Sequence, residues 1–165
     1  MTPNPLNPMR TLLLLLAVVF FIPNTARSQT AADSAAVLMT LDSWNQGWAE
    51  ANAQLAVESY AVDTDWTNAF GNRVQGRDAL EKTLEFIFGL DFVMAGDSGD
   101  NEFTDLIFLT PDVVLMRSKL VRAGQQYSTG ATMPDRHVHH LRVLQRREGA
   151  WQIVSHLISQ AHEKR

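Results

Sequence analysis

The chain has 165 residues, of which 45% are hydrophobic and 19% are charged. These proportions are typical of a globular protein, and the length suits one domain, since domains commonly hold roughly 100–200 residues. A formal net charge of −4 at pH 7 gives no overall field that would attract nucleic acid or an anionic membrane. With no cysteine, the chain can form no disulfide and has no thiol for catalysis.

The N-terminal segment has the pattern of a secretory signal peptide. Arg10 precedes an apolar run over residues 12–22, and Pro23 and a small, polar stretch up to Gln29 follow it. The run is shorter than the ~20 residues needed to cross a bilayer. We therefore predict a signal peptide over residues 1–28, one domain over residues 29–165, and a secreted or periplasmic protein without a stable membrane anchor.

Two helices are predicted at the start of the mature chain. The first begins at the N-cap candidates Asp33 and Ser34 and ends near Asn52. Its apolar positions recur at helical spacing and so lie on one face: Val37, Leu41, Trp44 and Trp48. Asn52 is expected to cap a shorter second helix in which the residues of one face are Leu55, Ala56, Ser59 and Tyr60.

A strand, a turn and a third helix are predicted next. Residues 65–70 are rich in aromatic and β-branched types, and Gly71–Asn72 indicates a turn into a return strand over residues 73–75. The third helix begins at residues 76–78 and ends at Gly89. We interpret residues 91–100 as a loop, because glycine, serine and acidic residues dominate there.

The C-terminal half is predicted to form four strands, over residues 103–109, 113–121, 137–146 and 151–159. Glu148–Gly149 suits a two-residue hairpin turn between the last two. We interpret the most basic group, Arg142, Arg146 and Arg147, as a solvated strand edge and not as a nucleic-acid site. Helices followed by a run of strands predict an α+β fold, with the helices on one face of a curved antiparallel sheet.

Four local motifs, in this order along the chain, resemble the nuclear transport factor two-like superfamily. They are Trp44-Asn45-x-Gly47, Tyr60-Ala61-x-Asp63, Gly76-Arg77-Asp78-Ala79-Leu80 and Arg147-Glu148-Gly149-x-Trp151-x-Ile153-Val154. The resemblance covers about residues 33–159 and is strongest to the SnoaL-like and SgcJ/EcaC-like branch. It implies a cone-shaped (cystatin-like) domain with a pocket between sheet and helices, and a homodimer formed through the sheet.

The same resemblance argues against ketosteroid isomerase activity. In that branch an aspartate on the first strand is the general base and a tyrosine on the first helix polarises the carbonyl of the substrate. The base position falls here on Asn68 and the tyrosine position on Trp44. An amide cannot take a proton at neutral pH, and an indole N–H is a weaker acid than a phenol.

Aromatic residues are the candidates for binding a small apolar or aromatic ligand, although such residues also build ordinary cores. The candidates are Trp44, Trp48, Tyr60, Trp66 and Phe70. By the two-residue period of a strand, Asn68 shares a face with Trp66 and Phe70. Asn68 then either orients the ligand or satisfies backbone groups at the following turn.

The histidines suggest two further kinds of chemistry. A regular hairpin turn at Glu148–Gly149 would place Leu141 opposite His156, so that His137, His139 and His156 share one face. Three imidazoles in this arrangement could bind zinc, but the spacing is unspecific and we predict no metal and no cofactor. His140 or His156 could instead act as a general acid or base.

These observations favour an exported module that binds a small apolar or aromatic molecule, with no reaction assigned. One alternative is an enzyme that uses Asn68 and a pocket histidine, either an SgcJ/EcaC-like oxidoreductase or a SnoaL-like isomerase, cyclase or dehydratase. The other alternative is a homodimeric assembly module.

Overall fold

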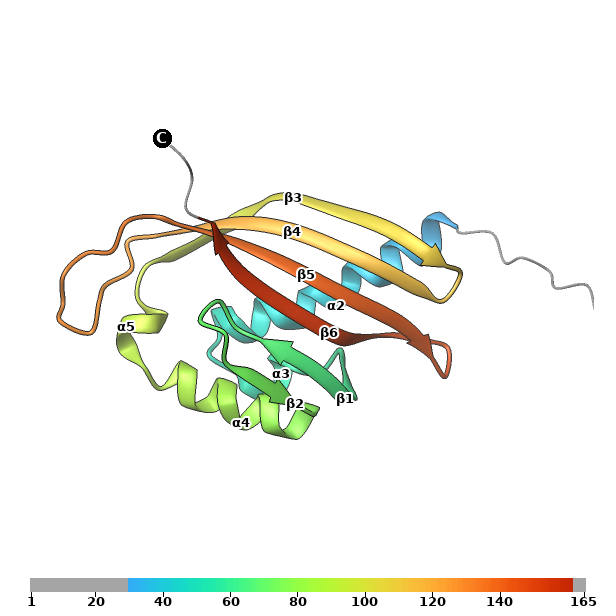
Figure 1. The fold of residues 1–165 in the computed structure, drawn as a ribbon, viewed down its shortest axis with the longest axis horizontal. Helices are drawn as coiled ribbons and strands as arrows, with labels where there is room; N and C mark the ends of the chain where they lie inside the picture. The colour runs from blue at the N-terminus through green and yellow to red at the C-terminus, as the bar shows by residue number, and fades with distance from the viewer. Residues whose placement is uncertain (1–29, 162–165) are drawn as a thin grey trace, which may run out of the picture.

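The structure is a computed structural model that describes residues 30–161. The predicted signal peptide, residues 1–28, lies outside the described residues. Figure 1 shows the elements in chain order: α2 (Ala31–Ala49), α3 (Ala53–Ala56), β1 (Tyr60–Thr67), β2 (Arg73–Gln75), α4 (Arg77–Phe88), α5 (Asp91–Met94), β3 (Asp97–Thr110), β4 (Val113–Ala123), β5 (Arg136–Arg147) and β6 (Ala150–Ala161). Within residues 30–161, no helix is long and apolar enough to cross a membrane.

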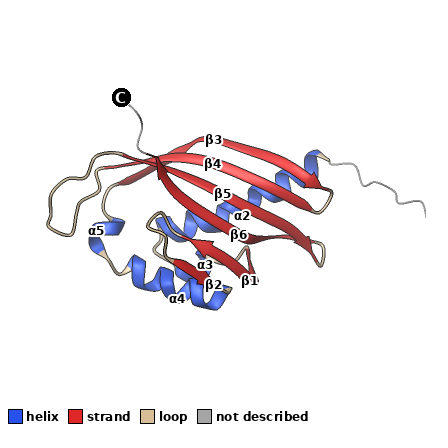
Figure 2. Ribbon diagram, in the orientation of Figure 1, coloured by secondary structure: helices blue, strands red, loops and turns tan. Residues whose placement is uncertain are grey.

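The strands form one curved sheet in the order β2-β1-β6-β5-β4-β3. Neighbouring strands are antiparallel except for β1 and β6, which are parallel. The helices pack on one side of this sheet, as Figure 2 shows. The predicted α+β architecture, with helices on one face of a curved sheet (Figure 2), is therefore confirmed, with a mixed sheet in place of the antiparallel one that we expected.

The predicted apolar stripe of the first helix is confirmed. Val37, Leu41 and Trp44 are buried in the core, and Trp48 packs against it while remaining partly exposed. Inward-pointing residues of β4, β5 and β6 belong to the same core as this stripe, because successive strand residues point to opposite faces of the sheet. They are Val114, Met116, Leu144 and Ile153.

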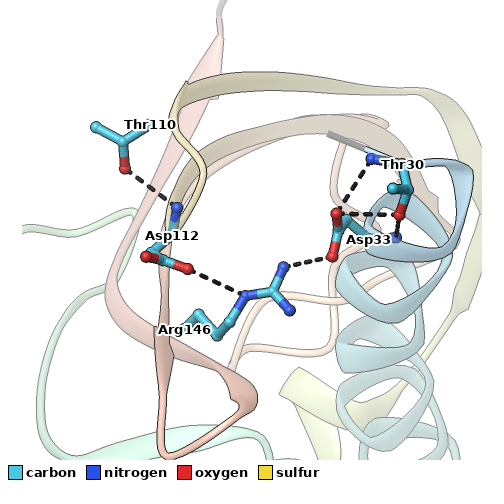
Figure 3. Close-up of polar contacts among 5 residues, drawn as sticks. All are labelled: Thr30, Asp33, Thr110, Asp112 and Arg146. Carbon is cyan, nitrogen blue, oxygen red and sulfur yellow. Dashed lines mark hydrogen bonds and ion pairs between the residues drawn. The ribbon is translucent and has the colours of Figure 1, made fainter. Parts of the chain in front are cut away.

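The helix α2 begins earlier than we predicted. Its N-cap is Thr30, whose hydroxyl accepts from the Asp33 backbone N–H, while the Asp33 carboxylate accepts from the Thr30 backbone N–H. Asp33 is therefore the third residue of a capping box and not the N-cap. Its carboxylate also pairs with Arg146 of β5, and Arg146 Nε lies 3.2 Å from a carboxylate oxygen of Asp112 (Figure 3). These contacts join the start of α2 to one end of the sheet.

Three element predictions need correction. The second helix is capped by Asn52 as expected, but it ends at Ala56, and Tyr60 already begins β1. The first strand ends at Thr67, before Asn68, because the chain turns there. Residues 91–100 are not a loop: they contain α5 and the start of β3, which pairs with the end of β4.

Candidate functional site

The hairpin between β5 and β6 decides which histidines meet. Arg147 lies opposite Ala150, as the two-residue turn predicts, and the register holds as far as Leu144 and Ile153. The next pair is Val143 with Ser155, so one residue of β6 is extra and the strand bulges there.

Beyond the bulge, His156 lies opposite Arg142 and not opposite Leu141. The inward face of the hairpin therefore carries His140, Arg142 and His156, all of which are buried. The prediction that His137, His139 and His156 share one face is wrong, because a one-residue shift moves a side chain to the other face. Within residues 30–161, no group of three or more histidine, aspartate or glutamate side chains is placed to hold a metal ion.

Tyr60, His156 and His140 form a continuous chain of hydrogen bonds inside the domain. Tyr60 Oη lies 2.6 Å from His156 Nδ1, and His156 Nε2 lies 2.8 Å from His140 Nδ1. The exposed fraction is 1% for Tyr60 and His156 and 7% for His140. The structure thus brings together two of the three candidate catalytic residues.

Arg142 lies beside this chain. Its guanidinium donates to Ser118 Oγ at 3.2 Å and approaches His140 Nδ1 at 3.3 Å, and the residue is only 2% exposed. The interpretation of Arg142 as part of a solvated edge is wrong. The alternation of β5 carried the missed signal, since Val138, His140, Arg142 and Leu144 occupy every second position and all point inward.

We infer the tautomers of both histidines from the 3.3 Å contact between Arg142 and His140 Nδ1. An arginine side chain only donates, so His140 Nδ1 is an acceptor and neutral His140 carries its proton on Nε2. His156 Nε2 must then donate to His140 Nδ1, which leaves His156 Nδ1 to accept from the Tyr60 hydroxyl. All donors are therefore aligned in one direction, from Tyr60 to His140.

Electrostatics agree with this assignment. Burial lowers the pKa of His140 and His156 well below the ordinary value, and the nearby charge of Arg142 lowers each pKa further. Burial raises the pKa of Tyr60, although Arg142 opposes that shift. Near pH 7 both imidazoles are neutral and the phenol keeps its proton.

The chain of hydrogen bonds ends on an open donor. The hydrogen bonds of His140 involve Nδ1, and no described residue forms one with its Nε2. Buried polar atoms without a hydrogen-bond partner among the described residues include Trp48 Nε1, Thr64 Oγ1, Trp66 Nε1 and Arg142 Nε. Unpaired buried donors are uncommon and costly, so a ligand that reached these groups would satisfy them.

The aromatic candidates fall into two groups. Trp44, Tyr60 and Trp66 are buried in the interior, and the Trp44 ring centroid lies 5.2 Å from that of His156. Trp48 is only partly buried and packs edge-on against Phe88 at 4.9 Å between ring centroids. Phe70 is 75% exposed because it lies in the turn after β1, so it does not line the interior with the others.

Asn68 lies away from the histidines. Its side-chain oxygen accepts from the backbone N–H groups of Phe70 and Asn72, both at 2.9 Å. This is the backbone-satisfying alternative that we considered, and it uses the amide to close the β1–β2 turn. Two hollows on the surface, beside α3 and α4, include none of the residues of the buried hydrogen-bond chain.

No protein-family model and no curated protein matches the sequence. Solved structures do match the fold. An uncharacterised protein with a cystatin-like fold from Caulobacter vibrioides has a TM-score of 0.66 at 18% identity, covering 78% of this chain and 89% of that one. A ketosteroid isomerase-like protein from Erwinia carotovora atroseptica has a TM-score of 0.64 at 14% identity, covering 78% and 96%. A putative scytalone dehydratase from Novosphingobium aromaticivorans has a TM-score of 0.62 at 15% identity, covering 81% and 90%.

These likenesses show the fold. The chain has a cystatin-like fold, as the sequence motifs implied. Proteins of this architecture serve different chemistries, so function has to be argued from the buried side chains described above.

Proposed function

We propose that this domain binds a small apolar or aromatic molecule between the sheet and α2, and that His140 donates a hydrogen bond to an oxygen of that molecule. The observation that carries the proposal is the aligned hydrogen-bond chain from Tyr60 through His156 to His140, which ends on an open Nε2–H. Trp44 and Trp66 provide the apolar surroundings. Such a setting, apolar with few polar groups, is typical of small-molecule sites.

A matched pair of ligands tests this proposal. We expect 2-acetylnaphthalene to quench tryptophan fluorescence saturably, and to bind roughly 2- to 10-fold more tightly than 2-ethylnaphthalene, since a neutral hydrogen bond contributes about 0.5–1.5 kcal/mol. The variant His140→Phe should lose that preference. His139→Phe is the control, because His139 is the preceding residue of β5 and points to the other face of the sheet. Absence of saturable binding, or a preference that persists in His140→Phe, would refute the proposal.

A second candidate is an enzyme that transfers protons at this site, favoured by the same aligned chain. His140 would give its Nε2 proton to the ligand oxygen, while His140 Nδ1 takes the proton of His156 Nε2 and His156 Nδ1 takes that of Tyr60. The step leaves a protonated ligand and a Tyr60 phenolate near Arg142. The names of two fold neighbours, an isomerase-like protein and a putative dehydratase, support chemistry of this kind.

Tyr60→Phe distinguishes the enzyme from the binding module. It removes the terminal proton source of the relay but leaves the His140 donor in place. Loss of turnover with retained ligand binding would support the enzyme, and unchanged turnover would remove the relay from the mechanism.

We also propose that the protein is exported, on the basis of the N-terminal pattern. The expected result is a mature N-terminus at residue 29, read by mass spectrometry of the secreted protein.

A further inference from the structure

Arg142 is a buried cation without an anionic partner. It is 2% exposed, and its contacts include the hydroxyls of Ser118 and Tyr60, an imidazole nitrogen of His140 and the ring of Trp44, whose centroid lies 5.8 Å from the guanidinium carbon. Its Nε has no hydrogen-bond partner among the described residues. A buried charge is costly unless an opposite charge accompanies it.

The two other arginines near the end of β5 each pair with a carboxylate. Arg146 pairs with Asp33, and Arg147 pairs with Asp63. Of these three arginines, only Arg142 forms no ion pair with a carboxylate of residues 30–161. The Tyr60 hydroxyl does not serve as an anionic partner of Arg142, because burial raises the pKa of this hydroxyl and keeps it protonated.

We infer that the interior of this domain takes an organic anion, with an aromatic or apolar body and one carboxylate or phenolate group, and that Arg142 supplies the counter-charge. The inference rests on the proposed function and narrows its ligand class. Two donors at neighbouring inward positions of β5 have no hydrogen-bond partner among the described residues: the buried Nε of Arg142 and, since the hydrogen bonds of His140 involve only Nδ1, Nε2 of His140. A guanidinium binds an anionic oxygen through charge-assisted hydrogen bonds, and these are stronger than neutral ones.

The test compares 2-naphthoate with 2-naphthamide, which have nearly the same shape and differ in charge. In calorimetric titrations of the purified protein at constant ionic strength, we expect the carboxylate to bind at least tenfold more tightly. Arg142→Met should reduce the difference to within twofold, whereas Arg142→Lys should keep part of it. Arg117→Met is the matched control, since Arg117 is exposed on the opposite face of the sheet, across from Leu141, and it should keep the full preference.

The outcomes separate the two proposals. Equal binding of both ligands would overturn the charge preference and leave the binding module standing, whereas binding of neither would overturn both. The melting temperature of unliganded Arg142→Met gives a readout that does not depend on ligand. We expect it to equal or exceed that of the wild type, because an uncompensated charge is removed. A clear fall, or failure of the variant to fold, would show that the chain itself compensates Arg142 and would overturn the inference.

Discussion

The hydroxyl of Tyr60 and the imidazole of His156 form a hydrogen bond between two residues that are each only 1% exposed. They come from different strands, and the 2.6 Å contact joins the start of β1 to β6. We expect Tyr60→Phe to lower the free energy of unfolding by about 1–3 kcal/mol, because it leaves a buried acceptor without a donor. Urea denaturation at pH 8 measures this.

The control for that variant is Tyr127→Phe, since Tyr127 is 46% exposed in the segment between β4 and β5. Its effect should stay within about 0.5 kcal/mol, as is usual for surface substitutions. Equal effects of the two variants would contradict a special contribution of the buried hydrogen bond.

The two buried histidines also make stability depend on pH. Their pKa values are lowered in the fold, whereas in the unfolded chain they titrate near 6.5. Below that pH the unfolded chain binds more protons than the folded one, so the free energy of unfolding falls as the pH falls. The slope approaches about 1.4 kcal/mol per pH unit for each histidine.

Denaturant titrations between pH 5 and pH 8 test this dependence, and His140→Gln should reduce the slope by about half. Asp33 does not contribute to the pH dependence of the free energy of unfolding between pH 5 and pH 8. Arg146 and the capping contacts with Thr30 lower the Asp33 pKa to about 2, so its stabilisation is lost only as the pH falls from about 4 towards that value. A slope that is unchanged in His140→Gln would show that other groups cause the pH dependence.

At the scale of elements, Gly47 of α2 lies close against the backbone of α3. A Cβ atom at this position would lie 2.4 Å from Ala56 N and 2.6 Å from Ala56 Cα. We expect Gly47→Ala to destabilise the domain by about 1–3 kcal/mol, because overpacking against α3 outweighs the gain in helix propensity of up to about 1 kcal/mol.

Gly89→Ala is the control for Gly47→Ala. Gly89 ends α4 with an ordinary negative φ of −75°, and the nearest atom to an added Cβ is 3.4 Å away. Its unfolding midpoint in urea should stay near that of the wild type. If Gly47→Ala is equally well tolerated, the tight α2–α3 contact is not needed for stability.

The elements differ in how far the sequence predicts them. The buried stripe of α2 and the turn at Glu148–Gly149 follow from local patterns, because helical spacing and a glycine at positive φ act within a few residues. The bulge in β6 does not, since an extra residue leaves a plausible apolar alternation on either side. That bulge places His156 beside Arg142, and so the main feature of the site depended on a register that no local pattern specifies.

At the scale of the whole molecule, the sheet presents two faces of different character. The inner face carries the buried hydrogen-bond chain, and the outer face exposes apolar side chains. Leu141 and Leu157 are cross-strand partners there, 38% and 47% exposed, and Ile107 is 47% exposed on β3. We propose that a second copy of the chain covers this outer face, because apolar side chains clustered on neighbouring strands favour association.

Light scattering coupled to size exclusion tests the dimer. We expect twice the monomer mass for the wild type at tens of micromolar, and the monomer mass for Leu157→Asp, since a carboxylate in an apolar interface is costly. Phe86→Asp is the control, because Phe86 is 69% exposed on α4 and away from the sheet. Since Leu157 points away from Arg142 and His140, Leu157→Asp should still bind 2-naphthoate as the wild type does. A wild-type monomer, or equal dissociation of both variants, would contradict assembly through this face.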